Sequence, residues 1–207
     1  MSMVETVVRR EPWEVGPRLV ELQLGPIERL LRVRSVAISA SADATPFHPA
    51  NAAGTLGYQH GTFALRDEFC KRDAIWRLDR SDGVEAIVND ALKIRVVFAN
   101  VDIACNDELK PKPGSRKGAG AERVCVGNLF DSLPEFAPRQ PDGWKTFYIM
   151  VDPRGAAELT RPVVTHNTFT AWIERNYLSN GDDLDRNTLA LHEGDVADDF
   201  DPEVVRK

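Results

Sequence analysis

The order of the hydrophobic patterns along the chain limits its fold more than any single motif does. Segments with helical spacing come first, several β-rich segments follow, and a segment with helical spacing comes last. A parallel α/β fold requires strands and helices in regular alternation, because each pair of parallel strands needs a crossover connection. The sequence lacks that alternation. It therefore predicts an α+β fold, with an antiparallel or mixed sheet packed by two or three helices.

The middle of the chain holds the clearest strand patterns. Leu92–Cys105 is rich in Ile, Val and Phe, and its alternation shifts phase near Asn100, as a β-bulge would cause. Trp144–Asp152 lies between the turn-forming sequences PDG and DPRG, which favours another strand. Glu122–Phe130 is interpreted as a strand that pairs with Leu92–Cys105. Two shorter segments also have strand character, namely Glu5–Arg10 and AIWRLDR.

Three segments have helical character. Arg18–Ala40 carries apolar residues at helical spacing after Pro26, although its first part, Arg18–Leu24, alternates and fits a strand equally well. Phe63–Arg72 predicts a short helix. Thr168–Ser179 predicts a closing helix, because its aromatic residues and Ile173 would share one face. Between the first two, residues 41–61 are rich in Pro and Gly and predict a long loop.

Length and charge predict one domain followed by a tail. The chain has 207 residues, enough for one domain with a buried core. Positions 181–207 contain nine acidic and three basic residues, whereas positions 1–180 contain 23 residues of each sign. We therefore expect a single domain over residues 1–180 and an acidic, loosely packed tail over residues 181–207.

Several protein classes do not fit the composition. No apolar run approaches the roughly 18 residues that a membrane-spanning helix requires, and the N-terminus lacks the pattern of a secretory signal. The three cysteines are odd in number and widely spaced, which argues against a disulfide framework. No short His or Cys spacing indicates a zinc site. We expect a soluble cytoplasmic protein with no membrane partner and no bound metal or cofactor.

The sequence KPKPGSRKGAG, Lys110–Gly120, is the main candidate for a binding site. It contains four basic residues and no acidic one. If the strands on either side pair, it forms the tip of a long hairpin, and basic tips bind nucleic-acid backbones by neutralising phosphates. The first hypothesis is a non-catalytic binding or adaptor protein that contacts nucleic acid or an acidic partner surface. Its proposed contact residues are Lys110, Lys112, Arg116, Lys117 and Arg123. The simpler interpretation is a solvated loop.

The adjacent sequence DELK supports an alternative function. Its Glu-x-Lys spacing looks like half of the PD-(D/E)xK nuclease motif, in which carboxylates bind a metal ion and a lysine assists the attacking water. The alternative is therefore a Mg²⁺-dependent nuclease that uses Glu108 and Lys110 with an upstream carboxylate such as Asp90 or Asp102. Asp82 and Glu85 are further candidates. Composition alone predicts about one acidic-x-Lys triplet, so the motif is a weak signal.

A third hypothesis concerns residues 41–61. The stretch GTLGYQHGTF combines flexibility with the polar side chains of Tyr58, Gln59 and His60, as a ligand-facing loop would. A small-molecule enzyme would then have its pocket under this segment. The simpler interpretation is that Tyr58 and Phe63 pin the loop to the core while His60 is solvated.

Overall fold

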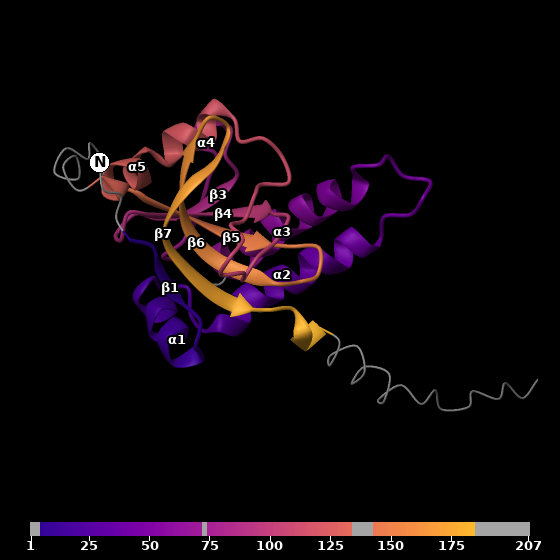
Figure 1. The fold of residues 1–207 in the computed structure, drawn as a ribbon, viewed down its shortest axis with the longest axis horizontal. Helices are drawn as coiled ribbons and strands as arrows, with labels where there is room; N and C mark the ends of the chain where they lie inside the picture. Colours follow the sequence, from indigo (N-terminus) through magenta and orange to yellow (C-terminus); the bar gives the residue numbers. More distant parts are fainter. Residues whose placement is uncertain (1–4, 72–73, 134–142, 185–207) are drawn as a thin grey trace, which may run out of the picture.

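A mixed sheet of seven strands forms the centre of the molecule (Figure 1). The computed structural model describes residues 5–71, 74–133 and 143–184. The strand order is β1-β7-β6-β5-β4-β3-β2. The strands are β1 (Val7–Arg9), β2 (Arg77–Asp79), β3 (Ala86–Asn89), β4 (Ile94–Asn100), β5 (Lys145–Val151), β6 (Ala157–Thr165) and β7 (Thr168–Ser179). The helices are α1 (Pro12–Glu21), α2 (Ile27–Ala42), α3 (Ala52–Cys70), α4 (Ala119–Val124) and α5 (Val126–Ser132), with a 3₁₀ turn at Ser81–Gly83.

The pairing of these strands confirms the predicted α+β fold with a mixed sheet. Strand β4 is parallel to β5, and β1 is parallel to β7, whereas all other neighbours are antiparallel. The parallel pair β4 and β5 needs a crossover, and the chain between them supplies α4 and α5. This single crossover determines where the candidate site lies.

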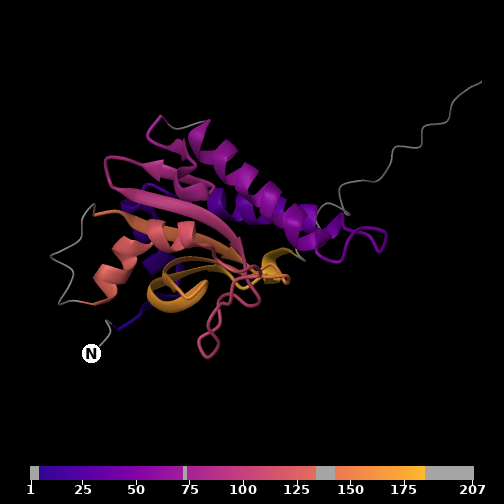
Figure 2. The same cartoon turned by 90° about the horizontal axis from the view of Figure 1, so that it is seen from above.

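Helices cover both faces of the central strands (Figure 2). Val96 and Phe98 of β4 point into a core with α1, α2 and α3, while Val97 and Ala99 point into a second core with α4. Because both faces are buried, the strand has no polar side. The α2–α3 hairpin extends beyond the sheet (Figure 1).

Glycines allow α3 to lie close to its neighbours. A Cβ atom on Gly57 would stand 2.3 Å from Ser41 Oγ of α2, and one on Gly61 would stand 2.5 Å from the Phe98 ring. Both distances are far inside van der Waals contact. Glycine has a low helix propensity, but at these two positions the close packing of α3 leaves no space for a larger side chain.

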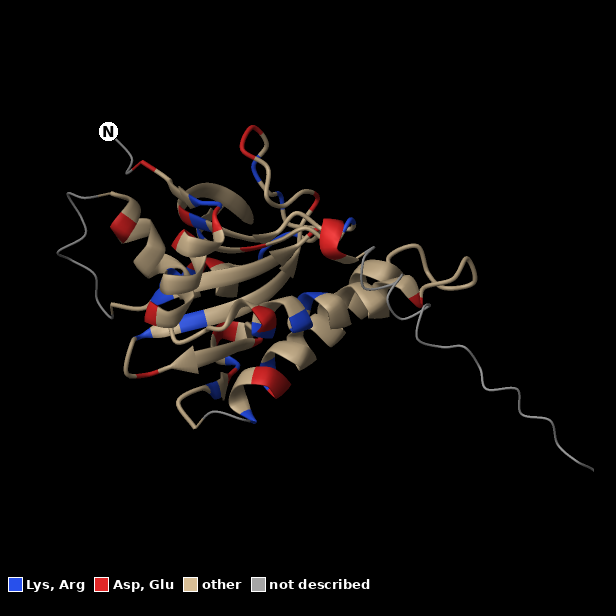
Figure 3. Cartoon of the chain, turned by 90° about the horizontal axis from the view of Figure 1, so that it is seen from below, with Lys and Arg blue, Asp and Glu red and all other residues tan. Residues whose placement is uncertain are grey.

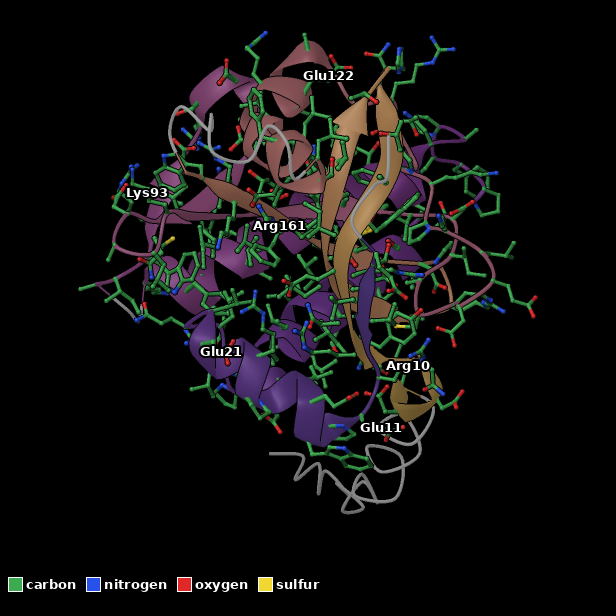
Figure 4. The ribbon with its side chains drawn as sticks, turned by 60° about the vertical axis from the view of Figure 1, so that its left-hand side comes forward. Arg10, Glu11, Glu21, Lys93, Glu122 and Arg161 are labelled. Atoms are coloured by element: carbon green, nitrogen blue, oxygen red, sulfur yellow. The ribbon has the colours of Figure 1, made fainter. Side chains whose placement is uncertain are left out.

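A buried polar network attaches α5 to the sheet. Asn128, which has no exposed surface, donates to the carbonyls of Thr146 and Pro162 at 2.6 and 2.8 Å. Its oxygen accepts the Arg161 Nε–H at 2.8 Å, and Arg161 also pairs with Asp131. Arg161 lies near the middle of the view in Figure 4. Every polar group of the Asn128 side chain is therefore satisfied.

Four details of the predicted fold are wrong. Glu122–Phe130 is helical, within α4 and α5, so Lys110–Gly120 is not the tip of a two-stranded hairpin. Thr168–Ser179 is strand β7, and the turn before it is made by His166 and Asn167 at φ 54° and 64°. The predicted loop at 41–61 contains the start of α3. Five helices pack on the sheet in the described ranges, which exceeds the two or three expected.

Other predicted elements agree with the structure. The strands predicted at Leu92–Cys105 and Trp144–Asp152 correspond to β4 and β5, and Arg18–Ala40 contains α2. Arg18–Leu24, which fitted strand or helix, lies partly in α1. None of the helices in the described part of the chain is long and apolar enough to cross a membrane.

The first residues of the predicted acidic tail pack on the body. The Asp183 carboxylate accepts two hydrogen bonds from the buried Arg34 guanidinium, at 2.8 and 2.7 Å. These bonds hold the pKa of Asp183 well below its usual range. The rest of the predicted tail, residues 185–207, lies outside the described residues.

Candidate ligand-binding cleft

A cleft of about 530 Å³ opens beside the carboxyl end of β4. Its walls come from the first half of α3, from the end of β4 and from the chain that returns toward α4. The lining residues are Asn51, Gly54, Thr55, Tyr58, Gln59, Ala99, Asn100, Gly114, Ser115 and Lys117. Because β4 and β5 are parallel, the cleft lies outside the carboxyl ends of parallel strands, where open sheets commonly bind ligands.

The segment between β4 and α4, residues 101–118, is named here the crossover loop. Its neck is closed by a bridge between Val101 and Pro113 and by the Gly114 N–H, which donates to the Asn100 carbonyl at 2.9 Å. Beyond the neck the loop projects from the sheet (Figure 2). The neck fixes Gly114 and Ser115 at the rim of the cleft.

The far part of the crossover loop is also held. Arg175 of β7 donates to the Asn106 carbonyl at 2.8 Å. Tyr177 donates to the Asp107 carboxylate at 3.0 Å, and Arg10 donates to the same carboxylate at 2.6 to 3.1 Å. The loop is therefore attached to the body at its base and at its tip.

Lys117 lies near the end of the crossover loop and is half buried. Its backbone N–H donates to the Asn167 carbonyl at 2.8 Å, and Glu122 of α4 accepts the Asn167 N–H at 3.0 Å. Glu122 is labelled near the top of Figure 4, beside the turn between β6 and β7. The Lys117 ammonium stands 5.5 and 5.3 Å from the ring centres of Tyr148 and Phe169. Burial lowers the pKa of Lys117 to about 8.

The crossover loop carries basic side chains that no carboxylate neutralises. Within residues 5–71, 74–133 and 143–184, fourteen arginines contact a carboxylate and Arg116 alone does not. Lys112 is exposed and has no ion pair in the same ranges, and the Lys110 ammonium rests 4.8 Å above the Trp172 ring. Figure 3 shows acidic residues at the loop's tip and basic residues along its arm.

The structure separates Arg123 from the other predicted contact residues. Arg123 lies on α4 and pairs with Asp82. Its charge is already balanced, so it is a weaker candidate for an anionic ligand than Arg116 is. Of the five residues expected to bind nucleic acid, Lys117 lines the cleft and Arg116 lines the hollow next to it. Lys110 and Lys112 lie farther along the loop.

Two upstream carboxylates of the nuclease alternative, Asp90 and Asp102, lie at opposite ends of β4. Asp90 lies before β4 and pairs with Arg77, whereas Asp102 follows the other end of the strand. The seven residues of β4 span roughly 20 Å between them. Glu108 is exposed in the crossover loop. No group of three His, Cys, Asp or Glu side chains able to hold a metal ion occurs among the described residues.

The sequence predicted two of the residues that line the cleft from α3. Tyr58 and Gln59, expected in a mobile loop, line the cleft from α3, while His60 is exposed and is not a lining residue. No pattern in the sequence indicated that Asn100 lines the cleft. Its side-chain amide donates to the Gly54 carbonyl at 2.7 Å and joins β4 to α3. The spacing of Gly54, Gly57 and Gly61 was the available signal, because it indicates a helix face in close contact.

A smaller apolar pocket adjoins the cleft. It measures about 340 Å³ and lies between the α2–α3 hairpin and the ends of β4 and β5. It shares Gly54 and Asn100 with the cleft. Its one carboxylate, Asp152, accepts backbone N–H bonds from Ala104, Arg154 and Ala156. That carboxylate therefore has a structural role in the turn after β5.

Comparison with models of known protein families, with curated proteins and with solved structures finds no match for this chain.

Proposed function

We propose that the protein is a non-catalytic binding protein for single-stranded nucleic acid, which it contacts through the cleft and the crossover loop. The observation that carries the proposal is the unpaired Arg116, in a molecule where the other described arginines contact carboxylates. An unbalanced cation of this kind favours an anionic ligand. Lys112, on the same loop, adds a second unpaired charge.

The neighbouring aromatic ring favours a nucleic acid over an acidic protein surface. Tyr58 is 38% exposed and lines the cleft beside Ser115 and Lys117. Proteins that bind single strands combine a basic path for the backbone with aromatic rings on which bases stack, each worth about 1–3 kcal/mol. Asn51 and Gln59 supply amide groups on the same wall, able to donate to and accept from base edges.

The size of the cleft favours a single strand over a duplex. A volume of about 530 Å³ lies within the range of small-molecule sites and suits an unstacked base with its sugar. A duplex keeps its bases stacked inside and offers none to an aromatic ring within a cleft. Binding would therefore be stronger for single strands.

Fluorescence anisotropy with labelled single-stranded and double-stranded DNA and RNA tests the proposal at low and physiological salt. We expect salt-sensitive binding of single strands that K112A/R116A weakens. The matched control is K71A/K145A, which removes two charges away from the cleft. Equal affinity of the two double variants, or no binding at low salt, would contradict the proposal.

A second pair of variants tests the aromatic contact. Y58A should weaken single-strand binding by roughly 5- to 150-fold, as loss of one stacked base predicts. F63A removes another exposed ring of the same helix, one that is 64% exposed and does not line the cleft. It should bind as the unchanged protein does. Magnesium added to the same samples, with the strands run on a gel, tests the nuclease alternative.

A further inference from the structure

A second hollow lies beneath the crossover loop. It measures about 240 Å³ and shares Tyr58, Ser115 and Lys117 with the cleft. Its other lining residues include Asp82, Arg116 and Tyr148. The hollow therefore places a lysine amine and an unpaired guanidinium around one small space.

No carboxylate holds Lys117 in its charged form. Among the described residues its side chain has no hydrogen bond or ion pair, and its contacts are the faces of Tyr148 and Phe169. The carboxylate that lines the hollow, Asp82, is paired with Arg123. Aromatic faces stabilise an ammonium less than a carboxylate does, so a larger fraction of the Lys117 amine is neutral near physiological pH than of an ordinary lysine.

The thiol and phenol groups around Lys117 keep their protons. Cys125 lies behind Tyr148, with its sulfur 3.9 Å from the tyrosine oxygen, and burial raises the pKa of its thiol to about 12. Burial also raises the pKa of Tyr148 and of Tyr58. Both phenols keep their protons, and Tyr58 remains a proton donor on the wall of the hollow.

A lysine amine of lowered pKa beside a fixed cation suits one class of ligand. A desolvated lysine without a carboxylate partner is the form in which lysine attacks carbonyl carbon. Arg116 has five N–H donors in the geometry that matches phosphate. The ligand class is therefore an aldehyde or ketone that carries a phosphate close to its carbonyl group.

We propose that Lys117 forms an imine with such a phosphorylated carbonyl compound in this hollow. The amine nitrogen attacks the carbonyl carbon to give a carbinolamine. The carbonyl oxygen then leaves as water, taking one proton from the amine and one from a donor such as the Tyr58 hydroxyl, which recovers its proton when the iminium nitrogen loses one. No electrons are gained or lost. Arg116 holds the phosphate while the carbon–nitrogen double bond forms.

Two kinds of ligand offer a carbonyl group close to a phosphate. One is a small phosphorylated aldehyde free in solution. The other is the open-chain sugar of an abasic nucleotide, whose aldehyde is flanked by strand phosphates, and this second source rests on the proposed binding of single strands. The two probes are pyridoxal 5′-phosphate and a single-stranded oligonucleotide with one abasic position.

Reduction of the imine with borohydride, followed by peptide mass spectrometry, tests the proposal. We expect each probe that enters the hollow to label Lys117 at least tenfold more than any of the other six lysines. K117R keeps the positive charge but cannot form the imine, so it should lose this label. K110R changes a lysine of the same loop and should keep it. The yield should rise as the pH increases through about 8.

The outcomes separate this proposal from the proposed function. Labelling by pyridoxal phosphate without binding of an undamaged strand would support the imine site and identify the free small molecule as its source. Labelling by the abasic strand would identify the nucleic acid. Strand binding without selective labelling by either probe would overturn the imine site alone. Labelling spread equally over surface lysines, or unchanged in K117R, would also overturn it.

Discussion

The buried pair of Glu158 and Arg175 should be the ionic interaction on which folding depends most. The Glu158 side chain is fully buried and the Arg175 side chain is 4% exposed. Arg175 donates to both carboxylate oxygens at 3.0 and 2.7 Å, and the Cys105 N–H and the Thr160 hydroxyl donate to them at 2.7 and 2.6 Å. Burial opposes the charge on Arg175, but the bonds from Glu158 raise its pKa.

Replacement of Glu158 by Gln would leave the buried Arg175 guanidinium without a counterion. The new side-chain amide would also point its N–H donors at groups that donate themselves, namely Arg175, the Cys105 N–H or the Thr160 hydroxyl. Removal of one partner from a buried pair costs about 3–5 kcal/mol. With a urea m-value of about 2 kcal/mol per M, the unfolding midpoint of E158Q should fall by roughly 1.5–2.5 M. The loss is large beside a total stability of about 5–15 kcal/mol.

A double-mutant cycle in urea, followed by circular dichroism, measures the interaction. R175M should also destabilise the fold, and E158Q/R175M should lose about 1–3 kcal/mol less than the sum of the single losses. The matched control is D90N, because the Asp90–Arg77 pair has side chains that are 58% and 56% exposed. D90N should leave the midpoint unchanged. Equal midpoints for E158Q and D90N would show that the buried pair contributes no more than an exposed one.

Three further predictions concern charge. K112A/R116A should lower the slope of log affinity against log salt by about 1.4 for single strands, measured by anisotropy titrations, whereas an unchanged slope would exclude phosphate contacts from both residues. The pKa of Lys117 falls from 10.5 to about 8 on folding. The unfolded chain therefore holds more protons at Lys117 between these values, so this residue adds stability as the pH rises from about 8 to 10, whereas the raised pKa of the Cys125 thiol acts in the opposite direction. In urea unfolding, the stability of the unchanged protein relative to that of K117M should therefore rise over this range, and a difference that stays constant would contradict the prediction. Removal of residues 185–207, which contain seven acidic and three basic residues, should strengthen strand binding if the tail competes for the crossover loop. Unchanged affinity would remove the tail from the mechanism.

The parts of the fold that the sequence predicted have strong local patterns. Strands β4 and β5 are nearly continuous apolar runs bounded by turns, and Pro26 directly precedes α2. β7 was missed because both of its faces are buried and its pairing with β6 shifts register twice after Arg161. Without a period of two, its aromatic residues imitate helical spacing. The second half of α3 was predicted as the helix Phe63–Arg72, but its first half was missed because its glycines contact neighbours that only the tertiary structure brings close.

The cleft, like the fold, could be predicted from the sequence only in part. The basic composition of the crossover loop is visible in the sequence, and so is the polar stretch around Tyr58. Their meeting at the end of β4 depends on the crossover between parallel strands, which the predicted hairpin excluded. The free charge of Arg116 was equally hidden, because it stands out only once the partners of the other arginines are known. The composition of the sequence indicates the crossover loop as a binding segment, but only the structure shows which of its residues, such as Arg116, are free to bind an anion.

Photocrosslinking shows directly whether bases of a single strand stack on Tyr58. A single strand that carries 5-iodouracil forms covalent bonds to aromatic side chains on which its bases stack, and peptide mass spectrometry identifies the side chain. The account predicts crosslinks at Tyr58 that disappear at high salt. Crosslinks at Trp13, Phe47 or Phe63, which are also exposed but lie outside the cleft, would contradict it. Absence of any crosslink at low salt would contradict it equally.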